Sequence, residues 1–420
     1  MSNHKSLIPA FSDHQWHNWS PRPELSPVFN RENVNGADVL HAASSGNYNG
    51  FGYWRCAIAA IDGGAAYAFS FDYCPERIDH EDMNVIVILT WQSEHGEMLT
   101  RDYVGERTEI GEGWKQLKRT VDAPLAAISV IVELGLRWTK EGTVRWRNPA
   151  VVRTEPIQHR KARVATTYLK QHGDLTANLN AMLDVIDRAG KHHADIICLS
   201  EVYYDRGMSL PFEEIETVPG KLTELIAEKA RANGAYVILC MKERAEELLY
   251  VTAVLIDRQG NIAGKFRKVH IPLCEAEDGV SAGTEYPVFE TDFGKIGILI
   301  CFDLMFPEAT QILAKAGAEM IFSPTLGDAQ LRARARAADH GIHVIISGAN
   351  EPRSSLIIDP LGEVISEASE ASEGLCLADI DLDQRHYVYW LDVGPANGEP
   401  LYVYANQRRT DTYRGDDFPR

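Results

Sequence analysis

Long apolar runs and paired cysteines are both missing from this 420-residue chain. No stretch of about 18 apolar residues occurs, and residues 1–9 contain no apolar segment of the kind found in secretory leaders. The seven cysteines show neither paired spacing nor a CxxC motif, which disfavours a disulfide framework and a zinc ribbon. We therefore expect a soluble, cytoplasmic protein whose thiols are reduced.

Positive charge is scarce as well. Lys and Arg number 42 against 60 Asp and Glu, so the formal net charge is −18. Nucleic acids and anionic membranes bind clustered Lys and Arg, so neither partner is expected. The apolar fraction of 45% and the charged fraction of 24% are ordinary for globular proteins. A chain of this length exceeds one ordinary hydrophobic core, which predicts two domains.

Residues 1–157 are predicted to form an antiparallel β-sandwich with an extended lead-in. Residues 1 to about 30 show no clear period, and we expect them to pack on the sandwich. Beyond about residue 33, short apolar and aromatic runs alternate with turn residues, as in all-β sandwiches. The expected strands are 53–60, 65–73, 83–91, 127–134 and 142–147.

The strand rhythm and aromatic residues of 113–118, 127–134 and 142–152 resemble carbohydrate-binding-module jelly rolls. This resemblance implies a carbohydrate partner for the first domain. Four tryptophans are candidates for stacking on sugar rings, with core or inter-domain packing as the alternative. They are Trp54, Trp91, Trp138 and Trp146.

Residues 158–385 are predicted to form an α/β layered domain. Buried strands alternate with amphipathic helices, which is the pattern of such domains. The expected strands are 163–168, 195–199, 236–240, 249–256, 296–300, 320–322, 344–346, 355–358 and 375–380, and the expected helices are 179–189, 222–230, 309–317 and 331–340. The remaining residues, 386–420, are expected to be an arm without a core of its own.

The second domain is organised around Cys301. The apolar run 296–300 predicts a buried strand that stops at Cys301, and Pro307 suits the first turn of a following helix. Cys301 is therefore expected on a tight strand-to-helix turn, exposed and near backbone N–H groups that lower the pKa of its thiol. From this position alone, a nucleophile and an ordinary buried cysteine both remain open.

Two other strands of this domain lead to reactive side chains. Glu201 follows the strand 195–199, and Lys268 lies just beyond a later strand pair. Functional groups gather at the carboxyl ends of strands in open α/β sheets, so an acid, an amine and a thiol are expected at one sheet edge. Taken alone, Glu201 and Lys268 would each fit a structural salt bridge. Together with Cys301 they suit acyl transfer, as base, oxyanion stabiliser and nucleophile.

Three motifs in this order resemble the nitrilase (carbon–nitrogen hydrolase) superfamily. They are Leu199-Ser-Glu201, Phe266-Arg-Lys-Val-His-Ile271 and Ile300-Cys-Phe-Asp-Leu-Met-Phe-Pro-Glu308, within a resemblance that spans roughly residues 160–385. The resemblance implies a four-layer αββα fold and a triad of Glu201, Lys268 and Cys301 that needs no metal or organic cofactor. It also implies homo-oligomers that pack through the helices after the cysteine and lysine strands, and the arm after residue 385 would then cross to a partner.

A second glutamate orients the lysine in this superfamily, and the spacing here leaves two candidates. Glu277 is favoured and Glu275 is the alternative. The chain also departs from the family pattern, because Thr166-Thr167 and Thr252 stand where many members carry Gln and Asn. These departures put the substrate class in doubt more than the chemistry.

The expected activity is hydrolysis of a non-peptide C–N bond, most simply in a small-molecule amide, through a thioester on Cys301. Glu201 would accept the thiol proton, while Lys268 and the backbone N–H of Phe302 stabilise the oxyanion. An N-carbamoyl compound or a nitrile is the alternative substrate for the same triad. A catalytically silent glycan-binding protein is the alternative from another class, and the intact triad disfavours it.

Overall fold

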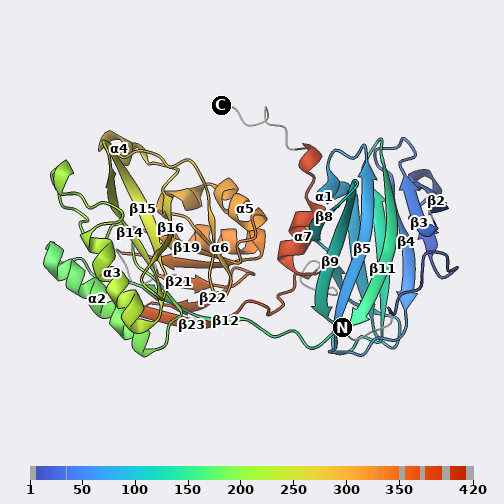
Figure 1. Cartoon of the computed structure of the whole chain (residues 1–420), viewed down its shortest axis with the longest axis horizontal. Helices are drawn as coiled ribbons and strands as arrows, with labels where there is room; N and C mark the ends of the chain where they lie inside the picture. Colours follow the sequence, from blue (N-terminus) through green and yellow to red (C-terminus); the bar gives the residue numbers. More distant parts are fainter. Residues whose placement is uncertain are drawn as a thin grey trace. The chain divides into compact units, whose positions relative to one another are not determined.

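The computed structural model describes residues 6–34, 36–327, 329–349, 355–368, 374–389 and 398–412. The chain divides into two compact units, shown in Figure 1. The first unit comprises Met1–Gln158 and Tyr387–Arg420, and the second comprises His159–His386. The described residues after Tyr387 group with the first unit. Their expected role in oligomer contacts stays a prediction.

The first unit is the predicted antiparallel β-sandwich. Its five-stranded sheet runs β1 (His17–Trp19), β4 (Phe51–Ile58), β10 (Ser129–Arg137), β6 (Val85–Gln92) and β7 (Met98–Tyr103). Its six-stranded sheet runs β2 (Val28–Val34), β3 (Ala37–Ala43), β11 (Thr143–Arg153), β5 (Ala66–Glu76), β9 (Trp114–Asp122) and β8 (Glu106–Gly111). Neighbouring strands such as β4 and β10 pair antiparallel throughout the described part of both sheets.

Large aromatic side chains fill the core of this sandwich. Trp54, Trp91 and Trp146 are buried in one cluster with side chains from both sheets. These three tryptophans therefore pack the core and have no free ring face for a sugar, whereas Trp138 is partly exposed. Phe11 and Trp16 of the lead-in belong to the same cluster, because apolar rings gain most when they leave water.

A helix from the C-terminal segment covers the outer face of the five-stranded sheet. This helix, α7 (Pro400–Gln407), inserts Val403 among Tyr53, Ile86, Ile88 and Tyr103. Two arginines of the sandwich bind this segment. Arg137 donates a hydrogen bond to the Asn406 carbonyl, and Arg119 forms an ion pair with Glu399, the residue before the helix. The C-terminal segment thus completes the first unit.

The second unit has the four layers that the resemblance implies. One sheet runs β16 (Ile262–Arg267), β15 (Leu248–Ile256), β14 (Tyr236–Ala245), β13 (Ile196–Cys198), β12 (Lys161–Thr167) and β23 (Leu375–Asp381). The other runs β17 (Val288–Glu290), β18 (Lys295–Ile298), β19 (Met320–Pro324), β20 (His343–Ser347), β21 (Leu356–Ile358) and β22 (Val364–Glu367). Helices α2 (Leu175–Lys191) and α3 (Lys221–Asn233) cover the first sheet, and α5 (Pro307–Lys315) and α6 (Gln330–His340) cover the second (Figure 1). No helix of the described residues is long and apolar enough to cross a membrane.

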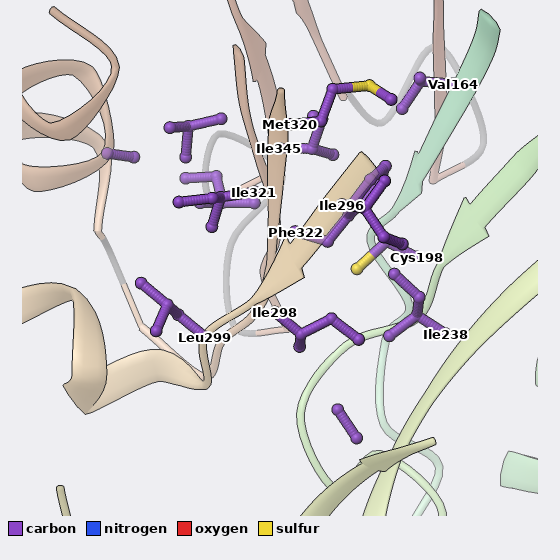
Figure 2. Packing of buried hydrophobic residues seen from close by; sticks show 14 of the residues in the cluster. Val164, Cys198, Ile238, Ile296, Ile298, Leu299, Met320, Ile321, Phe322 and Ile345 are labelled. Carbon is purple, nitrogen blue, oxygen red and sulfur yellow. The ribbon is translucent and has the colours of Figure 1, made fainter. Parts of the chain in front are cut away.

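Apolar side chains pack between the two sheets of the second unit (Figure 2). The labelled contributors from the first sheet are Val164, Cys198 and Ile238, and those facing them include Ile296, Ile298 and Phe322. Ile321, next to Phe322 on β19, points to the other side of the strand, as the two-residue period of a strand requires. Both faces of the central strands are therefore buried, which explains their nearly continuous apolar sequences.

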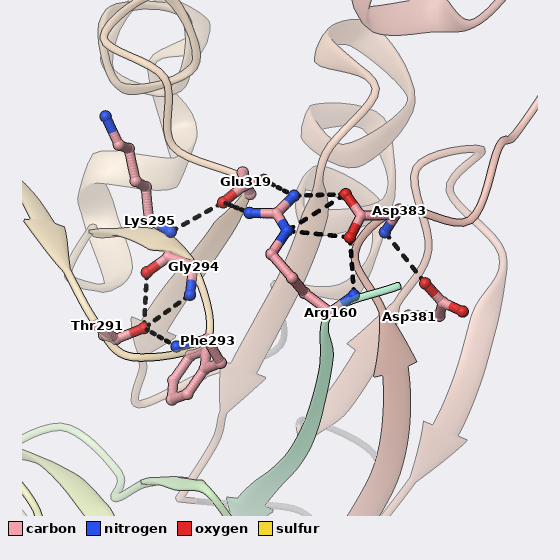
Figure 3. A network of polar contacts seen from close by, with 8 residues as sticks. All are labelled: Arg160, Thr291, Phe293, Gly294, Lys295, Glu319, Asp381 and Asp383. Atoms are coloured by element: carbon pink, nitrogen blue, oxygen red, sulfur yellow. Dashed lines mark hydrogen bonds and ion pairs between the residues drawn. The ribbon is translucent and has the colours of Figure 1, made fainter. Parts of the chain in front are cut away.

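Arg160 ties the two sheets together at the ends where their parallel strands begin (Figure 3). Its guanidinium binds Asp383 after β23, with Nη2 at 2.6 Å from Oδ1, and Glu319 before β19, at 2.8 Å from Oε1. Glu319 also accepts the backbone N–H of Lys295, at 2.9 Å. Because this network occupies the amino ends of the strands, the carboxyl ends remain for functional groups.

Candidate active site

Three strand ends bring Glu201, Lys268 and Cys301 into one site. Glu201 follows β13, Lys268 follows β16, and Cys301 begins the short turn η3 (Cys301–Met305) after β18. The Lys268 ammonium lies 2.9 Å from Glu201 Oε1. The Cys301 thiol interacts electrostatically with both of these charges. The three residues that the sequence singled out therefore share one site, in which Glu201 and Lys268 are buried and Cys301 is partly buried.

Lys268 is fully buried between two carboxylates. Its Nζ lies 2.9 Å from Glu201 and 2.7 and 2.8 Å from the two oxygens of Glu275. Burial disfavours the charged form, but the two carboxylates outweigh it, so the pKa of Lys268 is raised above its usual value. The side chain is therefore a permanent ammonium at neutral pH.

Glu277 was favoured as the glutamate that contacts Lys268, and this prediction is wrong. The carboxylate at Lys268 is that of Glu275, on the helix α4 (Leu273–Glu277). Two residues further along a helix lie about 200° around its axis, so Glu277 faces away and is exposed.

Glu201 is a buried carboxyl with a raised pKa. Burial is the largest cause, Lys268 opposes it, and the nearby charge of Glu275 adds to it. Its Oε2 atom is buried and has no hydrogen-bond partner among the described residues. A carboxyl of this kind can accept a proton and return it near neutral pH, which is what a general base and acid requires.

Cys301 has a strained backbone and a thiol that is protonated at rest. Its φ is 45°, in the left-handed region that side chains avoid. Burial and the charge of Glu201 raise its pKa to about 11, against the lowering effect of hydrogen bonds with Leu326 and Thr325. The expected lowering of this pKa is therefore wrong, because burial and the carboxylate outweigh the backbone N–H groups. The thiol depends on a base for ionisation.

The threonines that depart from the family pattern support neighbouring strands. Thr166 donates to the Ile346 carbonyl at 2.8 Å, and Thr167 donates to the Cys198 carbonyl at 3.1 Å. Thr252 donates to Glu243 at 2.6 Å. All three hydroxyls are buried and hydrogen-bonded, so these threonines hold the strands that carry the site and do not contact the triad in these bonds.

Sequence reasoning missed three residues that interact with the triad. Thr325 and Leu326 follow β19 and interact with Cys301, and the charge of Arg206, in the turn after β13, interacts with Glu201. All three follow a parallel strand, so the strand-end rule that found Glu201 could have found them. No group of three or more potential metal ligands occurs in the described ranges.

Comparisons with known proteins agree on one family. Residues 163–386, more than half of the chain, match the family model described as carbon-nitrogen hydrolase. The chain is 30% identical to a probable nitrilase of Schizosaccharomyces pombe over 221 residues, 48% of this chain and 78% of the relative. It is 32% identical to omega-amidase NIT2 of Xenopus tropicalis over 232 residues, 49% of this chain and 83% of the relative.

A solved structure shares the fold. The carbon-nitrogen hydrolase of Helicobacter pylori G27 matches with a TM-score of 0.54 and 21% identity, over 62% of this chain and 99% of that one. The family model, the two relatives and the four-layer fold lead to the same conclusion. The chain belongs to the carbon–nitrogen hydrolase family.

Proposed function

We propose that this carbon–nitrogen hydrolase cleaves a small-molecule amide through a thioester on Cys301. The observation that carries the proposal is the buried contact of Lys268 with Glu201, beside a thiol that is protonated at rest. The relatives named omega-amidases support an amide substrate. The relatives named nitrilases support a nitrile as an alternative substrate. An N-carbamoyl compound is the other alternative for the same triad.

In the first step Glu201 removes the proton of the Cys301 thiol. The sulfur then attacks the carbonyl carbon, a C–S bond forms and negative charge collects on the carbonyl oxygen. The Lys268 ammonium and the backbone N–H of Phe302 stabilise that oxygen, and loss of one such donor typically lowers kcat about 10²–10³-fold.

In the second step the C–N bond breaks. Protonated Glu201 gives its proton to the leaving nitrogen, which departs as ammonia or an amine, and the acyl group stays on sulfur. Water then attacks the thioester while Glu201 accepts one of its protons. The C–S bond breaks, and the proton returns to Cys301. The raised pKa of Glu201 suits both halves of this cycle.

Glu275 is proposed to orient Lys268. Its two oxygens accept hydrogen bonds from the ammonium at 2.7 and 2.8 Å, while Glu201 is the carboxyl that exchanges protons. Glu275 therefore stays ionised throughout the cycle, and its charge keeps Lys268 protonated.

Ammonia release over amides, N-carbamoyl compounds and nitriles tests the proposal. Wild type should release ammonia most readily from an amide, Cys301→Ala should not, and mass spectrometry should find an acyl adduct of wild type on Cys301. Cys274→Ala is the matched control, because Cys274 is an exposed thiol on α4 next to Glu275. Equal inertness of wild type and Cys301→Ala on all three classes, or an adduct on Cys274, would contradict the proposal.

We also propose that the protein is a cytoplasmic homo-oligomer. Ile312 on α5 and Leu331 on α6 are exposed apolar residues on the outer layer of the second unit, at 46% and 79% exposure, which supports contact with another copy. All seven cysteines are free, which suits a reducing compartment. Light scattering after size exclusion should give a multiple of 46.9 kDa that falls in Leu331→Glu, and cell fractionation tests the compartment.

A further inference from the structure

The strand register of the second sheet places Thr325 beside Cys301. Strands β18 and β19 run parallel, and Ile298 on β18 pairs with Phe322 on β19. The pairing extends one residue further, because the Leu299 N–H donates to the Phe322 carbonyl at 3.0 Å. Cys301 lies three residues beyond Ile298, and Thr325 lies three residues beyond Phe322. Neighbouring strands are about 4.8 Å apart, so these two residues leave the sheet next to each other.

The sulfur of Cys301 has two hydrogen-bond donors on this side. The Thr325 hydroxyl and the Leu326 backbone N–H both form hydrogen bonds with it, and both favour the ionised form. The charged groups that act on the sulfur come from the other sheet. The charge of Glu201 disfavours the thiolate, and the charge of Lys268 favours it. The two neutral donors therefore stabilise a negative sulfur that the carboxylate of the triad opposes.

The backbone of Thr325 is fixed from its other side. Its N–H donates to the Ser347 carbonyl on β20 at 2.9 Å. The Ser347 hydroxyl donates to the Thr167 carbonyl at 2.8 Å and lies 3.3 Å from the Ser200 hydroxyl. Ser200 directly precedes Glu201. Buried hydroxyls thus connect the segment of the base with that of Thr325, so the donor is in place before a substrate arrives.

The Thr325 hydroxyl is buried and has only a long hydrogen bond elsewhere. The side chain belongs to a residue that is 1% exposed, and its oxygen lies 3.5 Å from the Gly327 carbonyl. A hydroxyl has one proton to donate, and it rotates to suit its acceptor. It can therefore face Gly327 while the thiol is protonated and turn to the sulfur once Glu201 has taken the proton. Such a turn needs no movement of the backbone.

We propose that Thr325 is a further catalytic residue, whose hydroxyl donates a hydrogen bond to the Cys301 sulfur whenever that sulfur carries negative charge. This inference rests on the proposed function, in which the sulfur is negative twice: when it attacks the carbonyl carbon and when the C–S bond of the thioester breaks. The thiol proton still moves between Cys301 and Glu201, and Thr325 keeps its own proton. Lys268 stabilises the substrate oxygen in this cycle, whereas Thr325 stabilises the sulfur.

Alkylation of Cys301 by iodoacetamide tests the proposal without any amide substrate. The rate is measured at pH 8 in a Cys274→Ala background, because Cys274 is an exposed thiol, and mass spectrometry locates the adduct. Thr325→Val removes the hydroxyl and keeps the branched shape of the side chain. Alkylation and kcat/KM should each fall about tenfold or more, as expected for the loss of a hydrogen bond to a charged group. Thr325→Ser should restore most of both.

Two further variants complete the design. Thr325→Ala removes the same hydroxyl without placing a methyl group there, so it should show the same losses even if Thr325→Val packs poorly. Thr310→Val is the matched control, because Thr310 is a buried threonine on α5 whose hydroxyl has no hydrogen-bond partner among the described residues. This control should alkylate and turn over like wild type. Circular dichroism and thermal melting show which variants are folded.

Three results would overturn the proposal. Folded hydroxyl-free variants of Thr325 could alkylate as fast as wild type, or Thr325→Ser could be as slow as Thr325→Val. A fall in kcat/KM without a fall in alkylation would place the hydroxyl at the substrate instead of the sulfur. Failure of the proposed function gives a different pattern: Cys301 alkylates and Thr325→Val slows it, yet wild type releases no ammonia from any amide. In that case the hydrogen bond to the sulfur stands and the amide activity does not.

Discussion

Asp303 holds His270 by two contacts from one oxygen. Its Oδ1 lies 2.8 Å from the backbone nitrogen of His270 and 2.9 Å from Nδ1 of the ring. The other oxygen, Oδ2, accepts the backbone N–H of Ile300 at 3.0 Å. His270 lies two residues after Lys268, and Ile300 directly precedes Cys301. One buried carboxylate therefore sets the separation of the ammonium and the thiol.

Asp303→Asn should separate positioning from folding. The amide nitrogen of Asn is a donor and would face one of the three N–H donors that now bind the carboxylate. That hydrogen bond would be lost, and the segments that carry Lys268 and Cys301 would shift. We expect kcat/KM to fall about 10–100-fold, the loss typical of sub-ångström to ångström misplacement at a reacting centre. Steady-state kinetics measure this, and the fitted pKa of the acid limb should stay near the wild-type value. Glu290→Gln on β17, an exposed carboxylate, should leave kcat/KM unchanged.

Glu275→Gln and Glu277→Gln form a pair two residues apart on α4. Glu275 binds the buried ammonium, so its variant should lower kcat about 10²-fold, as when a group that orients a catalytic residue is lost. Glu277 is exposed, so its variant should have wild-type kinetics. The opposite ranking would show that the contact at Lys268 does not matter for turnover.

The pH dependence of kcat/KM should report Glu201. Its pKa is raised, and only its ionised form can take the thiol proton, so activity should rise with pH through that pKa and then level off. Cys301, with a pKa of about 11, stays protonated across the neutral range. Because the charge of Glu275 raises the pKa of Glu201, the residual activity of Glu275→Gln should have its acid limb at lower pH. An acid limb displaced to higher pH would refute this coupling.

The stability of the second unit should depend on Glu243 in acid. This side chain is buried, and hydrogen bonds from Arg267, Lys265 and Thr252 outweigh burial and lower its pKa from 4.5 to about 2. A lowered pKa stabilises the fold fully above pH 4.5, and the contribution, about 3 kcal/mol, is lost as pH falls toward 2.

Glu243→Gln should therefore be less stable than wild type at pH 7 by about this amount and should lose less stability between pH 4.5 and pH 2.5. Urea unfolding at several pH values measures both effects. Glu290→Gln again serves as the exposed control. Parallel curves for wild type and Glu243→Gln would contradict the assignment.

The sequence predicts the interior of the fold better than its margins. The apolar run 296–300 becomes β18 (Lys295–Ile298), and the helix expected at 331–340 is α6 (Gln330–His340). Among the strands that were not expected, β1, β2, β7, β8, β17 and β22 lie at the edges of their sheets, and β3 lies next to an edge. Their positions depend on the neighbours that they pair with.

In the site, too, some features could be predicted from the sequence and others could not. Glu201, Lys268 and Cys301 follow strands, and the order of strands along the chain indicates where they meet. The choice between Glu275 and Glu277 depends on the rotational phase of α4, which is too short to have a readable period. The pKa of Cys301 depends on how far the surrounding layers exclude water, and local sequence does not contain that information. Likewise, only the packing of two sheets shows that Trp54, Trp91 and Trp146 are core residues.

The left-handed backbone of Cys301 has a consequence for engineering. A glycine would occupy that conformation without the penalty that a Cβ carries there, about 1–2 kcal/mol. Thermal tolerance and turnover therefore compete for a single position in this chain. Selection for heat resistance alone would favour discarding the sulfur, so any directed-evolution campaign must score product formation alongside melting temperature.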